Sequence, residues 1–94
     1  MQIKDKVFVI TGGGRGLGLA MAEHLAQQGG KLALIDINAG DLDAAVAKLE
    51  KMGSEARGYV CNITDEKAVG DTFSAIVKEF GKVHGLVNNA GLMR

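Results

Sequence analysis

Short apolar runs alternate along the chain with longer segments in which apolar residues recur every three or four positions. The runs cover residues 6–10, 32–35, 56–61 and 83–87. Runs of this length, rich in β-branched residues, predict four strands. The first ends at Thr11 and the second at Asp36, while Arg57 and Gly58 interrupt the third and make it the weakest.

Three segments between these runs have the spacing of amphipathic helices. Their apolar positions are Leu17, Met21, Ala22, Leu25 and Ala26, then Leu42, Ala45, Val46, Leu49 and Met52, then Val69, Phe73, Ile76, Val77 and Phe80. Glycines that end helices follow each segment, at 29–30, 53 and 81. Thr64 is the candidate N-cap of the third helix, because Asp65 and Glu66 then lie in the first turn, where acids favour the helix dipole.

The order of elements is therefore β-α-β-α-β-α-β, with no linker or internal boundary. The first two strands are continuously apolar, which is typical of parallel strands covered on both faces. Right-handed crossovers then predict an α/β fold, a Rossmann-type doubly wound parallel sheet with strand order 3-2-1-4. Its ligand crevice is expected beyond the carboxyl ends of the strands, where the order reverses.

Glycine is the unusual feature of the composition. The 94 residues include 14 glycines and no proline, yet 47% are hydrophobic, so the chain is not a flexible linker. Five glycines fall within 12–18, between the first strand and the first helix. Glycine permits positive φ in such a loop and lets a pyrophosphate approach the backbone N–H groups at the helix start. A tight turn alone needs fewer glycines.

Two other phosphate-binding motifs fit this loop less well. Gly13 and Gly18 have P-loop spacing, but Leu19 and Ala20 follow where Lys and Ser/Thr are required, which disfavours nucleoside triphosphate hydrolysis. The strict G-x-G-x-x-G motif fails in every register. The pattern that fits is Thr-Gly-x3-Gly-x-Gly.

Asp36, at the end of the second strand, bears on which nucleotide the loop binds. A carboxylate there can accept hydrogen bonds from both ribose hydroxyls and repels a 2′-phosphate. It is alternatively a solvated loop acid or the N-cap of the next helix, a role that Asn38 fills equally well. Arg15 favours a phosphorylated ribose, but repulsion in a desolvated crevice discriminates more sharply. We therefore expect NAD, with NADP as the alternative.

Charge and composition exclude other classes of function. Eleven basic and eleven acidic residues are mixed along the chain, so no basic patch indicates a nucleic acid partner. No apolar run approaches the ~18 residues of a membrane span, and the single Cys61 allows no internal disulfide. No pair has metal-ligand spacing, and His24 is interpreted as a surface residue. A cytoplasmic location is expected.

Four motifs in order resemble the short-chain dehydrogenase/reductases over the whole chain. They are Thr11-Gly12-x3-Gly16-x-Gly18, Asp36, Asn62-Ile63, and Asn88-Asn89-Ala90-Gly91. The resemblance implies a nicotinamide cofactor. The residues that it implies are Gly12, Gly14, Arg15, Gly16, Leu17 and Gly18 at the pyrophosphate and adenosine ribose, Asp36 and Ile37 at the ribose, Asn62 and Ile63 at the adenine, and Asn89, Ala90 and Gly91 at the nicotinamide side. Asn62 stands where many members have Asp, but its amide oxygen can also accept from the adenine amino group.

The resemblance also implies an activity. Members transfer hydride between the cofactor and a ketone or secondary alcohol, and residues 88–94, which end in Arg94, are similar to 3-oxoacyl-acyl-carrier-protein reductases. A 3-oxoacyl thioester is therefore a candidate substrate, and homo-oligomers are common among relatives.

The catalytic residues of the family are not found in the 94 residues. The family uses a Ser and a Tyr-x-x-x-Lys motif, whereas the only tyrosine, Tyr59, is followed four residues later by Ile63. We expect residues 1–94 to be the N-terminal dinucleotide-binding portion of one Rossmann-type domain, inactive alone, with the catalytic portion absent. The alternative is a stand-alone nucleotide-binding or regulatory module.

Overall fold

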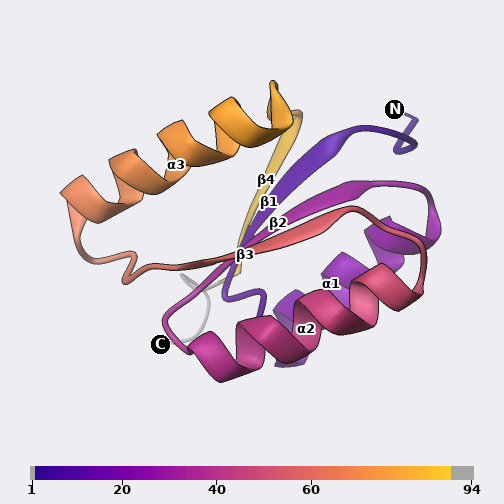
Figure 1. Ribbon diagram of the computed structural model, residues 1–94, viewed down its shortest axis with the longest axis horizontal. Coiled ribbons are helices and arrows are strands. Elements are labelled where there is room, and N and C mark those ends of the chain that lie inside the picture. The colour runs from indigo at the N-terminus through magenta and orange to yellow at the C-terminus, as the bar shows by residue number, and fades with distance from the viewer. Residues whose placement is uncertain (1, 90–94) are drawn as a thin grey trace.

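Four strands and three helices alternate along the chain in the computed structural model, which describes residues 2–89 (Figure 1). The strands are β1 (Val7–Thr11), β2 (Lys31–Asp36), β3 (Ala56–Val60) and β4 (Gly85–Asn88), and the helices are α1 (Gly16–Gln27), α2 (Ala39–Lys51) and α3 (Glu66–Phe80).

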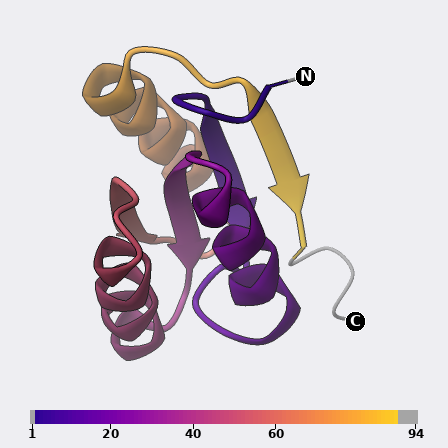
Figure 2. The ribbon, with the colours of Figure 1, turned by 90° about the vertical axis from the view of Figure 1, so that its right-hand side faces the viewer.

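The strands form one parallel sheet in the order β3-β2-β1-β4, which confirms the predicted topology. Helices α1 and α2 cover one face and α3 covers the other, as Figures 1 and 2 both show. Side chains of a strand alternate between the two faces. Phe8 and Ile10 therefore pack in the core under α1 and α2, while Val9 packs in the core under α3.

The packing of α1 differs from the predicted helix face. Its buried residues are Gly18, Ala22 and Ala26, whereas Leu17 is 55% exposed. Gly18, Ala22 and Ala26 are spaced four residues apart and form one stripe, and their small side chains let α1 approach the sheet closely. Leu17, one of the apolar positions that predicted this helix, therefore lies outside the buried stripe.

The start of α3 is a second difference. Its N-cap is Asp65, whose side chain accepts a hydrogen bond from the Ala68 N–H at 3.1 Å. Thr64 was therefore wrongly predicted as the cap. Thr64 instead donates from its N–H and its hydroxyl to Oδ1 of Asn62, at 3.0 and 2.7 Å. These two bonds shape the turn between β3 and α3.

Candidate functional site

The residues predicted to bind a ligand come together at the carboxyl ends of the strands. Parallel strands end at the same edge of a sheet, so segments that follow β1, β2 and β3 meet there. A pocket of about 150 Å³ lies at this edge. Five of its lining residues were predicted, namely Gly12, Asp36, Ile37, Asn62 and Ile63, and the sequence analysis missed the other two, Ile35 and Cys61.

The glycine loop places the start of α1 against the end of β1. The Gly12 N–H donates to the Ile35 carbonyl at 2.7 Å, and its φ of 67° lies in the left-handed region, where the chain leaves the strand. Gly18, in the first turn of α1, packs on the Gly12 carbonyl. A Cβ atom on Gly18 would lie 2.1 Å from that oxygen, so only glycine allows this close approach.

No side chain of its own caps the start of α1. Arg15 occupies the N-cap position, but its side chain makes no capping hydrogen bond, and the first turn contains no acidic residue. A helix start carries unpaired N–H groups and a partial positive charge. Because Gly12 lines the pocket, this open helix start lies beside it, in the arrangement that suits an anion such as a phosphate.

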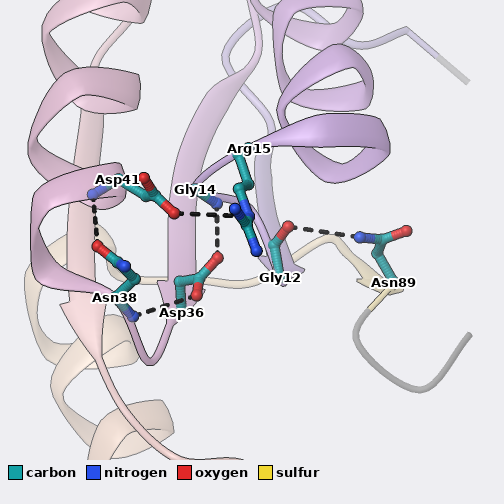
Figure 3. A network of polar contacts seen from close by, with 7 residues as sticks. All are labelled: Gly12, Gly14, Arg15, Asp36, Asn38, Asp41 and Asn89. Atoms are coloured by element: carbon teal, nitrogen blue, oxygen red, sulfur yellow. Dashed lines mark hydrogen bonds and ion pairs between the residues drawn. The ribbon is translucent and has the colours of Figure 1, made fainter. Parts of the chain in front are cut away.

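Asp36 is fixed at the end of β2 by two backbone N–H groups. Its Oδ2 accepts from Gly14 at 3.0 Å and its Oδ1 accepts from Asn38 at 3.2 Å (Figure 3). Each carboxylate oxygen has a further lone pair with which to accept from a hydroxyl group. The alternative role as a helix cap belongs to Asn38, whose Oδ1 accepts from the Asp41 N–H at 2.9 Å.

Arg15 forms an ion pair that the sequence analysis missed. Its Nε lies 3.6 Å from Oδ2 of Asp41, in the first turn of α2 (Figure 3). The only sequence signal for this role was the position of Asp41, three residues after the good N-cap residue Asn38. An acid at that position also stabilises the start of its own helix, so the spacing did not indicate a partner in the loop.

Asn89 reaches the same loop from beyond β4. It is 3% exposed, and its Nδ2 donates to the Gly12 carbonyl at 3.4 Å (Figure 3). Its Oδ1 is buried and has no hydrogen-bond partner within residues 2–89. Buried oxygens without a donor are rare and costly, so this atom marks a position where a donor fits. The predicted residues Ala90 and Gly91 lie outside the described residues.

Two predicted residues have different surroundings from those expected. Leu17 lines a separate apolar groove with residues that include Met21, Leu25 and Val87, rather than the pocket. Asn62 lines the pocket, but its amide oxygen already accepts both donors of Thr64. An amide oxygen has two lone pairs, so the amide nitrogen of Asn62 is the atom left to bind a ligand.

Tyr59 lies apart from this site. Its hydroxyl donates to Oε1 of Glu79 on α3, and burial, together with that carboxylate, raises the pKa of the phenol above its usual range. The half-buried strand residue predicted from the sequence is confirmed.

Residues 2–89 lack two other features, a cluster of metal ligands and a membrane-spanning helix. No group of three or more His, Cys, Asp or Glu side chains there is arranged to hold a metal ion. None of the described helices combines the length and the apolar character needed to cross a bilayer.

A family model described as short chain dehydrogenase matches residues 6–94. A rat (Rattus norvegicus) 3-oxoacyl-acyl-carrier-protein reductase is 40% identical over 90 residues, which cover 96% of this chain and 37% of the relative. The chain spans about a third of the length of the curated relatives it matches.

Solved structures share the fold. An NAD⁺-bound xylitol dehydrogenase is 42% identical with a TM-score of 0.88, over 92% of this chain and 33% of that one. An NADPH-dependent 3-quinuclidinone reductase from Rhodotorula rubra is 35% identical with a TM-score of 0.84, over 90% of this chain and 32% of that one.

Proposed function

This chain belongs to the short-chain dehydrogenase family, and on that premise we propose that it binds NAD at the carboxyl edge of its sheet. It does so as the nucleotide-binding part of an oxidoreductase acting on a ketone or secondary alcohol. When bound, the cofactor supplies hydride to the carbonyl carbon, or accepts it from the alcohol carbon, while a proton enters or leaves at the oxygen.

The observation that carries the proposal is the Asp36 carboxylate bonded to the glycine loop. Its Oδ2 lies 3.0 Å from the nitrogen of Gly14, which precedes Arg15, the N-cap position of α1. Backbone N–H donors that suit an anion therefore lie beside a carboxylate that accepts from hydroxyl groups. A ligand with both a pyrophosphate and a ribose requires this pair of features.

Neighbouring residues fit the rest of a dinucleotide. Ile37 and Ile63 line the pocket and are 66% and 39% exposed, which offers an apolar surface to a flat base. The buried Oδ1 of Asn89 awaits a donor on the β4 side of the loop. These residues are the ones that would hold the base and the ribose next to the nicotinamide.

The preference for NAD over NADP rests on Asp36 alone among these features. The solved relatives include both an NAD⁺ complex and an NADPH-dependent enzyme, so the family likeness supports a nicotinamide cofactor of either kind. A fixed carboxylate at the ribose repels a 2′-phosphate and binds two hydroxyls.

Calorimetric titration with NAD⁺ and NADP⁺ tests the proposal. We expect NAD⁺ to bind more tightly, and Asp36→Ala to weaken NAD⁺ binding by at least about 10-fold, since a hydrogen bond to a charged group contributes about 1.5–3 kcal/mol. Asp36→Asn keeps the size of the side chain and removes its charge, so it should mainly improve NADP⁺ binding. Tighter binding of NADP⁺ by the unaltered chain, or no binding of either cofactor, would contradict the proposal.

Within this activity, a 3-oxoacyl thioester is the substrate class that we propose, with support from the rat relative. The test compares reduction of a short 3-oxoacyl thioester with that of a simple ketone by NADH in the intact protein. The 94 residues assayed alone should bind NAD⁺ and give no turnover, because Tyr59 is bonded to Glu79 away from the pocket. An enzyme-like rate from them would overturn the assignment of catalysis to other residues.

A further inference from the structure

Arg15 and Asp41 join the glycine loop to α2 next to the proposed ribose position. The Arg15 side chain is 84% exposed, whereas that of Asp41 is 32% exposed, so the aspartate is the better anchored partner. Arg15 is also the only cationic residue of the loop that links β1 to α1. Its position therefore decides whether a positive charge is available to a nearby anion.

Gly14 shows how closely the two aspartates flank this loop. A Cβ atom on Gly14 would lie 2.9 Å from Oδ2 of Asp36 and 2.9 Å from Cβ of Asp41. Both residues therefore lie on the side of Gly14 from which a Cβ atom would project, and Figure 3 shows both carboxylates beside the loop. Asp36 bonds to the backbone N–H of Gly14, while Asp41 bonds to the side chain of Arg15.

The two carboxylates consequently have different chemical partners. Asp36 meets uncharged donors and keeps its negative charge unbalanced by any ion pair in the described part of the chain. Asp41 balances the charge of Arg15, a group that can attract a 2′-phosphate because guanidinium groups bind phosphate through two parallel hydrogen bonds.

We infer that Asp41 is a specificity-determining positioning residue, which pairs with Arg15 and keeps its guanidinium from binding a 2′-phosphate beside Asp36. The inference rests on the proposed function. Asp36 disfavours NADP by repulsion, and Asp41 disfavours it by withdrawing an attraction. The effect of Asp41 must therefore depend on Arg15, whereas that of Asp36 does not.

The experiment measures dissociation constants for NAD⁺ and NADP⁺ in Asp41→Asn and in a matched control, Asp43→Asn. Both substitutions remove one negative charge from α2, but Asp43 is exposed and has no part in the loop contacts. Exposed ion pairs are worth up to about 1 kcal/mol, so Asp41→Asn should tighten NADP⁺ binding about two- to fivefold and leave NAD⁺ nearly unchanged. Asp43→Asn should leave the ratio between the cofactors as it was.

Two further variants separate positioning from a general effect of charge or stability. Asp41→Glu keeps the carboxylate and should restore the original cofactor ratio. In an Arg15→Gln background, Asp41→Asn should no longer change NADP⁺ binding. An equal gain in that background, or an unchanged ratio in Asp41→Asn while Asp36→Ala shifts it, overturns the inference and leaves the proposed function intact. Failure of the unaltered chain to bind either cofactor overturns both.

Discussion

The three helices start in two different ways, although each follows a strand of the same sheet. The side chain of Asn38 caps α2 and that of Asp65 caps α3, each accepting from a backbone N–H three residues later. Arg15 stands at the same position of α1 and caps nothing. Under the proposed function, the donors at this open start of α1 are the ones that would bind the cofactor's pyrophosphate.

At the opposite edge of the sheet, where the strands begin, a side chain also accepts from a backbone N–H group, as at the capped helices. There the Val7 N–H, at the start of β1, donates to Nδ1 of His84 at 2.9 Å, and the His84 N–H donates to the Val7 carbonyl at 2.8 Å. At α2, α3 and the start of β1, a side chain therefore accepts a hydrogen bond from a backbone N–H group that would otherwise lack a partner. Among these backbone ends in residues 2–89, the start of α1 is the one that lies beside the pocket and lacks such a side chain.

The largest effect is expected from disrupting the close contact between α1 and β1. Gly18→Ala would place a Cβ atom 2.1 Å from the Gly12 carbonyl, so the start of α1 must move away from the strand. Overpacking of this kind costs about 1–3 kcal/mol of unfolding free energy, and the displaced helix start should bind NAD⁺ at least tenfold more weakly. Urea unfolding and an NAD⁺ titration measure the two effects.

Gly70→Ala is the matched control for this substitution. Gly70 lies within α3, and an added Cβ there meets nothing within 4 Å. Alanine should raise the free energy of unfolding by about 0.5–1 kcal/mol, because glycine is a poor helix former. If Gly18→Ala behaved like Gly70→Ala in both measurements, the close approach would play no part in binding.

A smaller effect is expected from removing a cap. Asp65→Ala deletes the acceptor at the start of α3 and should lower the free energy of unfolding by about 1 kcal/mol. The NAD⁺ dissociation constant should not change, since Asp65 does not line the pocket. Asp65→Ser supplies another capping oxygen and should recover most of the loss. A change in NAD⁺ affinity with Asp65→Ala would contradict the view that cofactor binding depends on the open start of α1 and not on the capped start of α3.

The reverse substitution gives α1 the cap that it lacks. Arg15 has φ −163° and ψ 176°, the extended backbone of an N-cap residue, so Arg15→Ser can place a hydroxyl on the open N–H groups. We expect a gain of about 0.5 kcal/mol in stability and NAD⁺ binding about two- to threefold weaker than in Arg15→Gln, which removes the charge without adding a cap. Equal binding by the two variants would show that the open donors do not contact the cofactor.

The strand order and most of the pocket could be predicted because they depend on local patterns. Continuous apolar runs defined β1 and β2, and a glycine-rich loop followed by an acid at the end of the next strand indicated Gly12 and Asp36. Each of these signals is contained in one segment of sequence.

Features that depend on contacts between segments were missed. The pairing of Arg15 with Asp41 joins a loop to a helix 26 residues later, and nothing in either segment specifies it. The cap of α3 was missed for a local reason: Thr64 has the right residue type, but it bonds to Asn62 in the turn after β3, and the next residue, Asp65, caps the helix.

The smallest effect is expected at the start of β1, where a titratable side chain, His84, accepts a hydrogen bond from the backbone. Nδ1 of His84 can accept from the Val7 N–H only while it carries no proton. Desolvation of the half-buried ring, together with the positive charges of Lys6 and Lys82, lowers the pKa of His84 below 6.5. The neutral, hydrogen-bonded form is therefore favoured in the folded chain.

The sign of the resulting pH dependence follows from proton counting. Above pH 6.5 the histidine is neutral in both states, and its contribution to stability is fully present. As the pH falls through 6.5, the unfolded chain binds the proton first, so the free energy of unfolding decreases until the lower folded pKa is reached. Urea unfolding at a series of pH values between 8 and 5 measures this decrease. His84→Asn offers an amide oxygen to the same N–H without titrating, so it should flatten this part of the profile. If His84→Asn kept the full decrease, another group would be responsible, and the start of β1 would not owe its pH dependence to the bond from Val7.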